Sequence, residues 1–301
     1  MKNEIKAAVV QHGCQGDYQK NLEQSIDGIN KATERGANLV LLPELHTLPY
    51  FCICEDGRYF DLAEPIPGTT TEALAILARE RQTVIVASVF EKRTSGIYHN
   101  TAVVLDRDGS IAGTYRKMHI PDDPGYYEKY YFTPGDQGFI PVSTSIGRLG
   151  VLVCWDQWFP EAARLMALAG AEVLLFPSAI GWEPGDNKQE KARQLDAWIT
   201  IQKAHAIANH LPVLVSNRIG HETDPAGNTD GTDFWGSSFI AGPQGELLAT
   251  AGTDKAAVIN ADLDIEKTET LRRSWPYFRD RRIDHYHGLL ERFLDTTSPP
   301  D

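Results

Sequence analysis

The sequence predicts an α/β fold in which β-sheets are layered with helices in one domain. Short apolar runs alternate along the chain with stretches whose apolar residues recur every three or four positions, as in strands followed by helices. Two pairs of runs are joined by glycine-containing turns typical of hairpins. We expect a single domain across 1–301, with a core over about 5–264 and a helical extension over about 265–301.

Each predicted strand is a short apolar run bounded by polar or turn residues. The run 39–42 is continuous and ends at Pro43, as expected for a strand that is buried on both faces. An Asp-Arg-Asp-Gly turn at 106–109 and a Gly-Pro-Gln-Gly turn at 242–245 each indicate a hairpin. In chain order, the predicted strands are 5–11, 39–42, 83–90, 100–105, 110–115, 149–153, 173–176, 213–216 and 256–261.

The predicted helices are marked by apolar spacing and by their first residues. Leu22, Ile26 and Ile29 lie at helical steps and predict a helix over 17–35. The sequence Thr69-Thr70-Thr71-Glu72 has the pattern of a capping box and predicts a helix from Thr69 to about Arg81. The remaining predicted helices are 160–169 with Pro160 near its first position, 191–210, and a tail from about 264.

Charge and composition exclude several classes of function. The 301 residues include 41 acidic and 29 basic side chains, a formal net charge of -12, which argues against a nucleic-acid partner and favours a cationic small-molecule substrate. No apolar run approaches the ~18 residues of a membrane helix, and the N-terminal run is too short for a signal peptide. Four cysteines in a chain of this size indicate free thiols and a cytoplasmic protein.

Three reactive residues each follow a predicted strand. Glu44, Lys117 and Cys154 therefore lie where open α/β sheets bind ligands, beyond the carboxyl ends of strands. A carboxylate can take the proton of an attacking thiol, and an ammonium can stabilise the oxyanion that forms. The backbone N–H of Trp155 is a candidate second oxyanion donor. Considered one by one, such a cysteine is more often a small core residue, and a glutamate after proline a surface residue.

Three sequence blocks resemble the nitrilase superfamily of carbon–nitrogen hydrolases in order and spacing over about 5–264. The blocks are Leu42-Pro43-Glu44, Tyr115-Arg116-Lys117-Met118-His119 and Cys154-Trp155-Asp156-Gln157-Trp158-Phe159-Pro160-Glu161. The resemblance implies an α-β-β-α sandwich, no cofactor, and a homo-oligomer built on a dimer. It implies that Glu44 is the general base, Lys117 the oxyanion donor and Cys154 the nucleophile. Glu128 matches a second glutamate of the family and is expected to orient Lys117 or the substrate. Taken alone, Glu128 would pass for a solvated loop acid.

Segments 50–56, 121–129 and 216–220 are similar to the branch of this superfamily that removes the carbamoyl group from N-carbamoylated diamines. The expected substrate is therefore a cationic ureido compound, cleaved to an amine, carbon dioxide and ammonia through a thioester on Cys154. Relatives that act on N-carbamoyl amino acids often carry arginines where this chain has Gln157 and Trp158, so a substrate carboxylate would lack a bidentate partner. Two alternatives stay open: an amidase for N-carbamoyl amino acids or aliphatic amides, and a non-catalytic binding protein of the same fold.

Several further residues are candidates for the pocket. Glu183 follows the predicted strand 173–176 by one short loop and is our candidate for the substrate ammonium, although it could be a solvated loop acid. Trp158 and Trp182 are expected to line the pocket together with Trp155, although aromatic residues are also ordinary core residues. Trp182 stands where a small residue is expected, which affects the width of the pocket. His119 is expected to support the site from behind, because Lys117 explains that block better than a papain-like Cys–His pair does.

We expect no metal ion. Cys52-Ile53-Cys54 does not have the Cys-x-x-Cys spacing of metal and redox pairs, and no second pair exists in the sequence. His285 and His287 alternate on a polar tail, where histidines are usually solvated. A structural role near the mouth of the site is the better interpretation of the cysteine pair.

Overall fold

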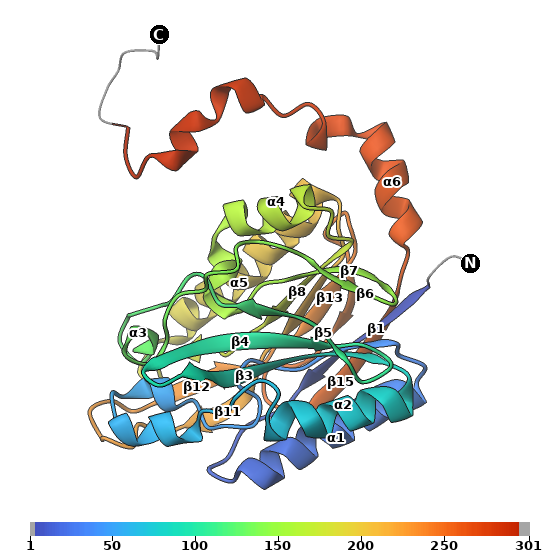
Figure 1. Cartoon of the computed structure of the whole chain (residues 1–301). Coiled ribbons are helices and arrows are strands. Elements are labelled where there is room, and N and C mark those ends of the chain that lie inside the picture. The colour runs from blue at the N-terminus through green and yellow to red at the C-terminus, as the bar shows by residue number, and fades with distance from the viewer. Residues whose placement is uncertain (1–3, 295–301) are drawn as a thin grey trace.

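A computed structural model describes residues 4–294 and shows two six-stranded sheets packed face to face, with helices on both outer faces (Figure 1). Helices α1 (Tyr18–Glu34) and α2 (Thr69–Arg81) cover the first sheet. Helices α4 (Pro160–Leu168) and α5 (Lys188–Asn209) cover the second sheet. The predicted α-β-β-α sandwich is confirmed.

The first sheet has the strand order β15-β1-β2-β3-β4-β5. Strands β1, β2 and β3 are parallel, whereas β4 is antiparallel to both β3 and β5, so β5 runs in the same direction as β2. The carboxyl ends of β2 and β5 therefore meet at one edge of the sheet. The strand bounds are β1 Ile5–Gln11, β2 Leu39–Leu41, β3 Val84–Thr94, β4 Ile97–Leu105, β5 Ile111–Arg116 and β15 Ala257–Leu263.

The second sheet has the order β14-β13-β10-β8-β7-β6, with β7, β8 and β10 parallel. Its strands are β6 Val142–Thr144, β7 Gly147–Val151, β8 Val173–Pro177, β10 Val213–Ser216, β13 Phe239–Ala241 and β14 Leu247–Thr250. A third, three-stranded sheet covers one end of the sandwich and consists of β9 Gly181–Trp182, β11 Ile219–Glu222 and β12 Thr232–Trp235. The sequence pattern did not predict this sheet, because its strands are short and mixed in polarity.

Continuous apolar strands arise because both faces of each sheet are covered. In β1, Ala7 and Val9 point into the core between the two sheets, whereas Ala8 and Val10 pack beneath the helices of the first layer. In β2, Leu41 points between the sheets while Val40 packs beneath those helices. Side chains on opposite faces of one strand thus enter different cores, which is why no polar alternation is visible in the sequence.

The structure corrects several predicted boundaries. Strands β3 and β4 form one long hairpin around Gly96, whose φ is 77°, and extend well beyond the predicted 83–90 and 100–105. The added parts of both strands are rich in polar residues, so the apolar runs in the sequence did not predict them. The predicted capping box at Thr69 is wrong: α2 is capped at Gly68, whose N–H donates to Thr71 Oγ1 at 2.8 Å. Helix α5 begins at Lys188 rather than 191, because the Asn187 side chain caps its first turn.

The chain ends in an arm, which we define as residues 265–294. It contains α6 (Ile265–Ser274) and three short 3₁₀ turns, η4 Pro276–Phe278, η5 Ile283–His285 and η6 His287–Leu290. The root of the arm is attached to α5, where Tyr277 Oη donates to Ile207 O at 2.7 Å. The end of the predicted extension, 295–301, lies outside the described residues. Within residues 4–294, no helix is long and apolar enough to span a bilayer.

The packing between the sheets predicts the effect of a core truncation. Leu41 is fully buried on β2, three residues before Glu44. Leu41→Ala should lower the free energy of unfolding by about 2–5 kcal/mol, because it removes buried methyl groups and leaves a cavity. Leu248→Ala is the control, since Leu248 is 43% exposed and should change stability by less than about 0.5 kcal/mol. Urea unfolding of both variants measures the difference, and equal losses would contradict this account of the core.

Candidate active site

The structure brings Glu44, Lys117 and Cys154 together at the shared end of the two sheets. Glu44 follows β2, Lys117 follows β5 and Cys154 follows β7. Glu44 and Lys117 have no exposed surface and Cys154 is 4% exposed. Lys117 Nζ donates to Glu44 Oε1 at 2.8 Å, and both residues interact electrostatically with Cys154. The convergence of strand ends that the sequence predicted is therefore present in the fold.

Two glutamates hold the buried lysine. Glu128 lies on the short helix α3 (Glu128–Tyr131), and its Oε2 accepts from Lys117 Nζ at 2.6 Å. Asn100 Nδ2 and Lys117 both donate to Glu44 Oε1. Glu44 Oε2 is buried without a hydrogen-bond partner in the described structure. That oxygen is therefore free to accept a proton.

Protonation states follow from burial and from these ion pairs. Burial raises the pKa of the Cys154 thiol well above its usual range, and the Glu44 carboxylate raises it further, outweighing Lys117. Burial alone would lower the pKa of Lys117, but Glu128 and Glu44 outweigh burial and raise it. The resting site therefore contains a neutral thiol and an ammonium. Attack by Cys154 requires a base, which an unpartnered carboxylate oxygen can provide.

The backbone at Cys154 is strained and well supported. Cys154 has a φ of 43°, in the left-handed region that residues other than glycine rarely occupy. The buried Asp156 carboxylate accepts four hydrogen bonds around this turn, from Tyr115 Oη at 2.8 Å, Val153 N at 2.9 Å, and His119 N and Nδ1 at 3.0 and 2.6 Å. A turn of this kind at the end of a strand presents a nucleophile clear of its own backbone.

His119 supports this turn rather than acting on the thiol. Its imidazole bonds to Asp156 and stacks on Phe159, with ring centroids 3.7 Å apart. This placement agrees with the supporting role expected from the sequence. Asp156 itself was missed, although it lies only two residues after Cys154 in the third block.

A cavity of about 650 Å³ ends at Cys154. Trp155 and Trp158 line it, as predicted, and so does Glu183. Trp182 was also expected there but is not among the lining residues. Its indole N–H donates to Lys191 O at 2.9 Å, and its ring packs on Trp235, which lines the cavity instead. The width of the pocket is therefore not set directly by Trp182.

The cavity is strongly acidic. Among the described residues that line it are five carboxylates and no lysine, arginine or histidine. The five are Asp123, Glu128, Glu183, Asp186 and Asp230. A cavity of this sign attracts cations and disfavours anions.

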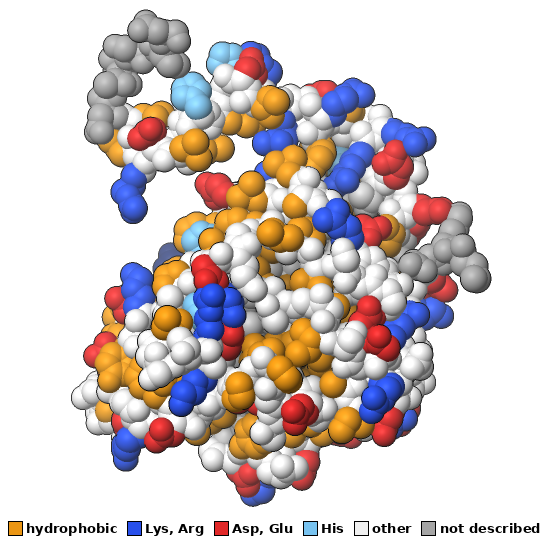
Figure 2. Space-filling model, viewed as in Figure 1, with side chains coloured by type: hydrophobic (Ala, Val, Ile, Leu, Met, Phe, Trp, Pro, Cys, Tyr) orange, Lys and Arg blue, Asp and Glu red, His pale blue; other side chains and the backbone are white. Residues whose placement is uncertain are grey.

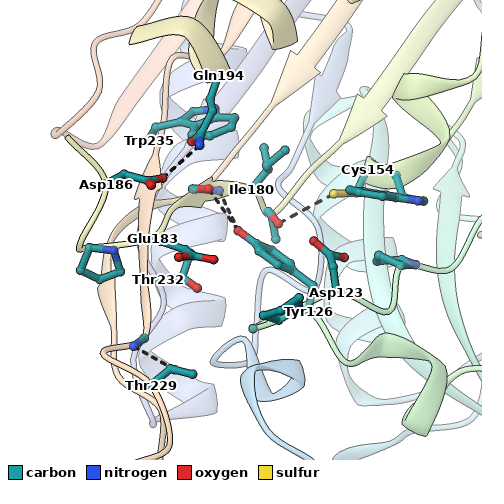
Figure 3. A pocket seen from close by; sticks show the side chains of 18 of the residues that line it. Asp123, Tyr126, Cys154, Ile180, Glu183, Asp186, Gln194, Thr229, Thr232 and Trp235 are labelled. Atoms are coloured by element: carbon teal, nitrogen blue, oxygen red, sulfur yellow. Dashed lines mark hydrogen bonds between the residues drawn. The ribbon is translucent and has the colours of Figure 1, made fainter. Parts of the chain in front are cut away.

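Asp123 is one of three lining carboxylates, with Asp186 and Asp230, that were not predicted from the sequence. Its Oδ1 is buried without a hydrogen-bond partner in the described structure, and burial raises its pKa, with Asp122 and Glu183 adding to the effect. In the view of Figure 3, Asp123 lies on the Cys154 side of the Tyr126 ring and Glu183 on the opposite side. The pair Asp122-Asp123, in the same segment as Glu128, was the available signal.

The other residues named from the sequence do not line the cavity. Gln157 is buried, where its Oε1 accepts from Trp198 Nε1 at 2.8 Å, and it does not line the cavity. Cys52 and Cys54 are buried free thiols, while His285 and His287 lie exposed on the arm. Over residues 4–294, no group of three or more histidine, cysteine or acidic side chains is arranged to hold a metal ion.

Comparison with known proteins agrees with this geometry. The family model described as carbon-nitrogen hydrolase matches residues 6–273. The chain is 44% identical to an N-carbamoylputrescine amidase of Solanum lycopersicum, covering 98% of this chain and 97% of the relative, and 42% identical to a citrullinase of Francisella tularensis, covering 96% and 99%. A crystal structure of a carbon-nitrogen hydrolase from Helicobacter pylori G27 superposes with a TM-score of 0.94 at 52% identity, covering 97% and 100%. The chain therefore belongs to the carbon–nitrogen hydrolase family, within the nitrilase superfamily that its three sequence blocks predicted.

Proposed function

We propose that this enzyme hydrolyses N-carbamoylputrescine to putrescine, carbon dioxide and ammonia. The observation that carries the proposal is the acidic cavity that ends at Cys154. The substrate has a ureido group at one end and an ammonium at the other. A thiol beside a buried carboxylate and a buried ammonium suits the first end, and a cavity lined by carboxylates suits the second. The similarity to plant N-carbamoylputrescine amidases supports the same substrate.

In the first half-reaction, Cys154 Sγ attacks the ureido carbon while Glu44 Oε2 accepts the thiol proton. The ammonium of Lys117 and the N–H of Trp155 stabilise the oxyanion of the tetrahedral intermediate. Glu44 then transfers the proton to the departing nitrogen, and ammonia leaves. A carbamoyl thioester remains on Cys154. Glu128 keeps Lys117 in place, because its Oε2 accepts a hydrogen bond from the Lys117 ammonium at 2.6 Å while Glu44 accepts another from the same ammonium.

In the second half-reaction, Glu44 removes a proton from a water molecule that attacks the thioester. The thiolate leaves and recovers its proton, and the released carbamate decomposes to putrescine and carbon dioxide. The reaction is a hydrolysis, and each proton is transferred by groups already in the cluster. No step requires a metal ion or an organic cofactor.

The remote ammonium is bound by Asp123 and Glu183 in this proposal. Asp123 contributes a buried oxygen that lacks a hydrogen-bond partner, and the two carboxylates interact electrostatically. The apolar faces of Trp155, Trp158 and Tyr126 line the same cavity and suit the methylene chain. Citrulline, the substrate named for one relative, carries a carboxylate beside its ammonium. That carboxylate would face an acidic wall without a described cationic partner.

We also propose that the chain is one catalytic domain over about 5–264 with an extension, and that it forms a cytoplasmic homo-oligomer built on a dimer. Four free thiols support a reducing compartment. The arm carries hydrophobic side chains that the rest of the chain leaves exposed (Figure 2), including Leu290 at 90%, Phe293 at 74% and Ile283 at 73%. Apolar exposure on this scale is typical of a surface that a partner covers, and light scattering of the full chain measures the mass.

Removal of the nucleophile tests the mechanism. Cys154→Ala should lower ammonia release from N-carbamoylputrescine by roughly 10⁴-fold or more, because no other group can form the thioester. Cys54→Ala is the matched control, since Cys54 is a buried thiol outside the cavity, and it should keep its activity. Circular dichroism checks that both variants fold. Substantial turnover by Cys154→Ala would show that the nucleophile is wrongly assigned.

Substrate charge tests the acidic cavity. Asp123→Asn should lower kcat/KM for N-carbamoylputrescine by about 10- to 100-fold, because a hydrogen bond to a charged group is lost. Glu183→Gln should have a smaller effect, since Glu183 is exposed. Butylurea lacks the ammonium and is the internal control, so both variants should hydrolyse it at the wild-type rate. Wild-type enzyme should prefer N-carbamoylputrescine to citrulline and to N-carbamoyl-β-alanine. Equal losses on charged and neutral substrates, or a preference for citrulline, would contradict this assignment.

The pKa of Glu128 predicts how kcat/KM changes on the acid side of its pH profile. Burial raises the pKa of Glu128 to about 7, with Glu44 adding to the effect and Lys117 opposing it. Protonation of Glu128 removes its ion pair with Lys117, so kcat/KM should fall as the pH drops below about 7.

The stability effect of Glu128 has the opposite sign. Its pKa in the folded state lies above its unfolded value, so its contribution to stability is present at low pH and is lost as the pH rises through about 7. Glu128→Gln cannot titrate and should lose both pH dependences, at lower activity. Rate profiles and urea unfolding from pH 5 to 9 test this, and an unchanged acid limb in Glu128→Gln would assign that limb to another group.

A further inference from the structure

A second buried cation, Arg218, lies behind the catalytic cluster and has no role in the chemistry described above. It follows β10 in the second sheet and has no exposed surface. The guanidinium lies over the rings of Tyr50 and Phe234, at 5.7 and 5.2 Å from their centroids. A fully buried arginine is costly unless its hydrogen bonds are satisfied, so its partners indicate what it organises.

Arg218 holds the turn that follows Glu44. Its Nη2 donates to Glu44 O at 2.8 Å and to Leu45 O at 3.2 Å, and its Nη1 donates to Leu48 O at 3.3 Å. Leu45 has a φ of 48°, a left-handed conformation that leucine adopts only under constraint. Ser88 Oγ accepts from Leu45 N at 3.1 Å on the other side. The residue next to Glu44 is thus fixed in a strained conformation from both its N–H and its carbonyl.

Arg218 is also linked to the second glutamate. Its Nη1 donates to Glu222 Oε1 at 2.7 Å, and Glu222 Oε2 accepts from Tyr50 N at 2.6 Å. The Tyr50 hydroxyl then donates to Glu128 Oε1 at 2.6 Å. Burial, together with Glu128, raises the pKa of Tyr50, which keeps this hydroxyl protonated as a donor. An unbroken series of short contacts therefore runs from Arg218 to the carboxylate that holds Lys117.

We propose that Arg218 is a positioning residue that sets both glutamates on Lys117, Glu44 through the backbone carbonyls of 44–48 and Glu128 through Glu222 and Tyr50. The guanidinium is suited to this task because its planar fork reaches several acceptors at once, whereas an ammonium on a flexible chain reaches fewer. The proposal rests on the roles of Glu44, Lys117 and Cys154 given above.

The test is Arg218→Lys, which keeps the positive charge but removes the planar guanidinium and its several N–H donors. The kcat for N-carbamoylputrescine should fall by about 10- to 100-fold, since small displacements of catalytic groups have effects of this size. KM should change by less than about threefold, because Arg218 does not line the cavity. Arg164→Lys is the matched control: Arg164, on α4, also donates to a backbone carbonyl, Ala208 O at 2.8 Å, but that carbonyl belongs to α5 and not to the cluster, so the kcat of this variant should stay at the wild-type value.

Alkylation of Cys154 by iodoacetamide gives a second readout that does not depend on the substrate. Proton removal by Glu44 should limit this reaction, so Arg218→Lys should slow it by about tenfold near neutral pH and change its pH profile, while Arg164→Lys should not. If wild-type enzyme fails to hydrolyse N-carbamoylputrescine but the two variants still differ in alkylation, the proposed substrate is wrong and the role of Arg218 stands. A lower melting temperature with unchanged kcat and unchanged alkylation in folded Arg218→Lys would show that Arg218 only stabilises the fold.

Tyr50→Phe tests the connection from Arg218 to Glu128 separately from the connection to Glu44. This variant removes only the hydroxyl that reaches Glu128, and it should lower kcat without changing KM. Combined with Arg218→Lys, it should cost less than the product of the two single effects, because both changes break the same series of contacts. Strictly multiplicative effects would overturn the link to Glu128. Should Arg218→Lys fail to fold, Glu222→Gln in its place decides the same question by the same cycle with Tyr50→Phe.

Discussion

An ammonium without exposed surface must be paired or lose its proton, and Lys117 is held between two carboxylates. Much of the site follows from this requirement. Glu44 follows β2 and Glu128 lies on α3 after β5, so the lysine joins segments that are far apart in sequence. One oxygen of Glu44 is occupied by Lys117 and Asn100, and the other is left free to accept a proton. The same ion pairs that keep the lysine charged therefore leave Glu44 Oε2 as the oxygen that could act as the proposed base.

The backbone is strained at one proposed catalytic residue, Cys154, and at the residue that follows another, Glu44. Cys154 and Leu45, which follows Glu44, have left-handed backbone conformations. Each turn is supported from outside: Asp156 collects four donors around Cys154, and Arg218 binds three carbonyls around Leu45. Strained residues persist only where their surroundings fix them, at a cost of about 1–3 kcal/mol each. The buried polar residues behind the site thus maintain a geometry that the local chain would not adopt.

Charge is distributed so that chemistry and recognition use different groups. The cationic groups near the site, Lys117 and Arg218, are buried behind Cys154 and are each paired with carboxylates. The cavity in front of Cys154 is left with acidic side chains. A cationic substrate would thus be attracted by the carboxylates along the cavity. At the end of the cavity it would reach Lys117 and the two glutamates, whose charges largely balance one another. The acidic composition of the whole chain is consistent with an acidic cavity but does not show which carboxylates line it.

By itself, the sequence determined the layered α/β fold, the family, and the three strand-end residues Glu44, Lys117 and Cys154. These features depend on local runs of apolar residues and on short motifs, which the chain carries whatever its long-range contacts are. Only the tertiary structure decided the capping of α2 at Gly68, the third sheet, and the turning away of Trp182. It also revealed Asp123, Asp156 and Arg218. The contacts of Asp156, Arg218 and Trp182 are with partners more than thirty residues away, namely Tyr115, Glu44 and Trp235, and the interest of Asp123 depends on the burial of one of its oxygens. Spacing in a sequence records which residues are present, whereas burial and the pairing of polar groups are set when distant segments pack together.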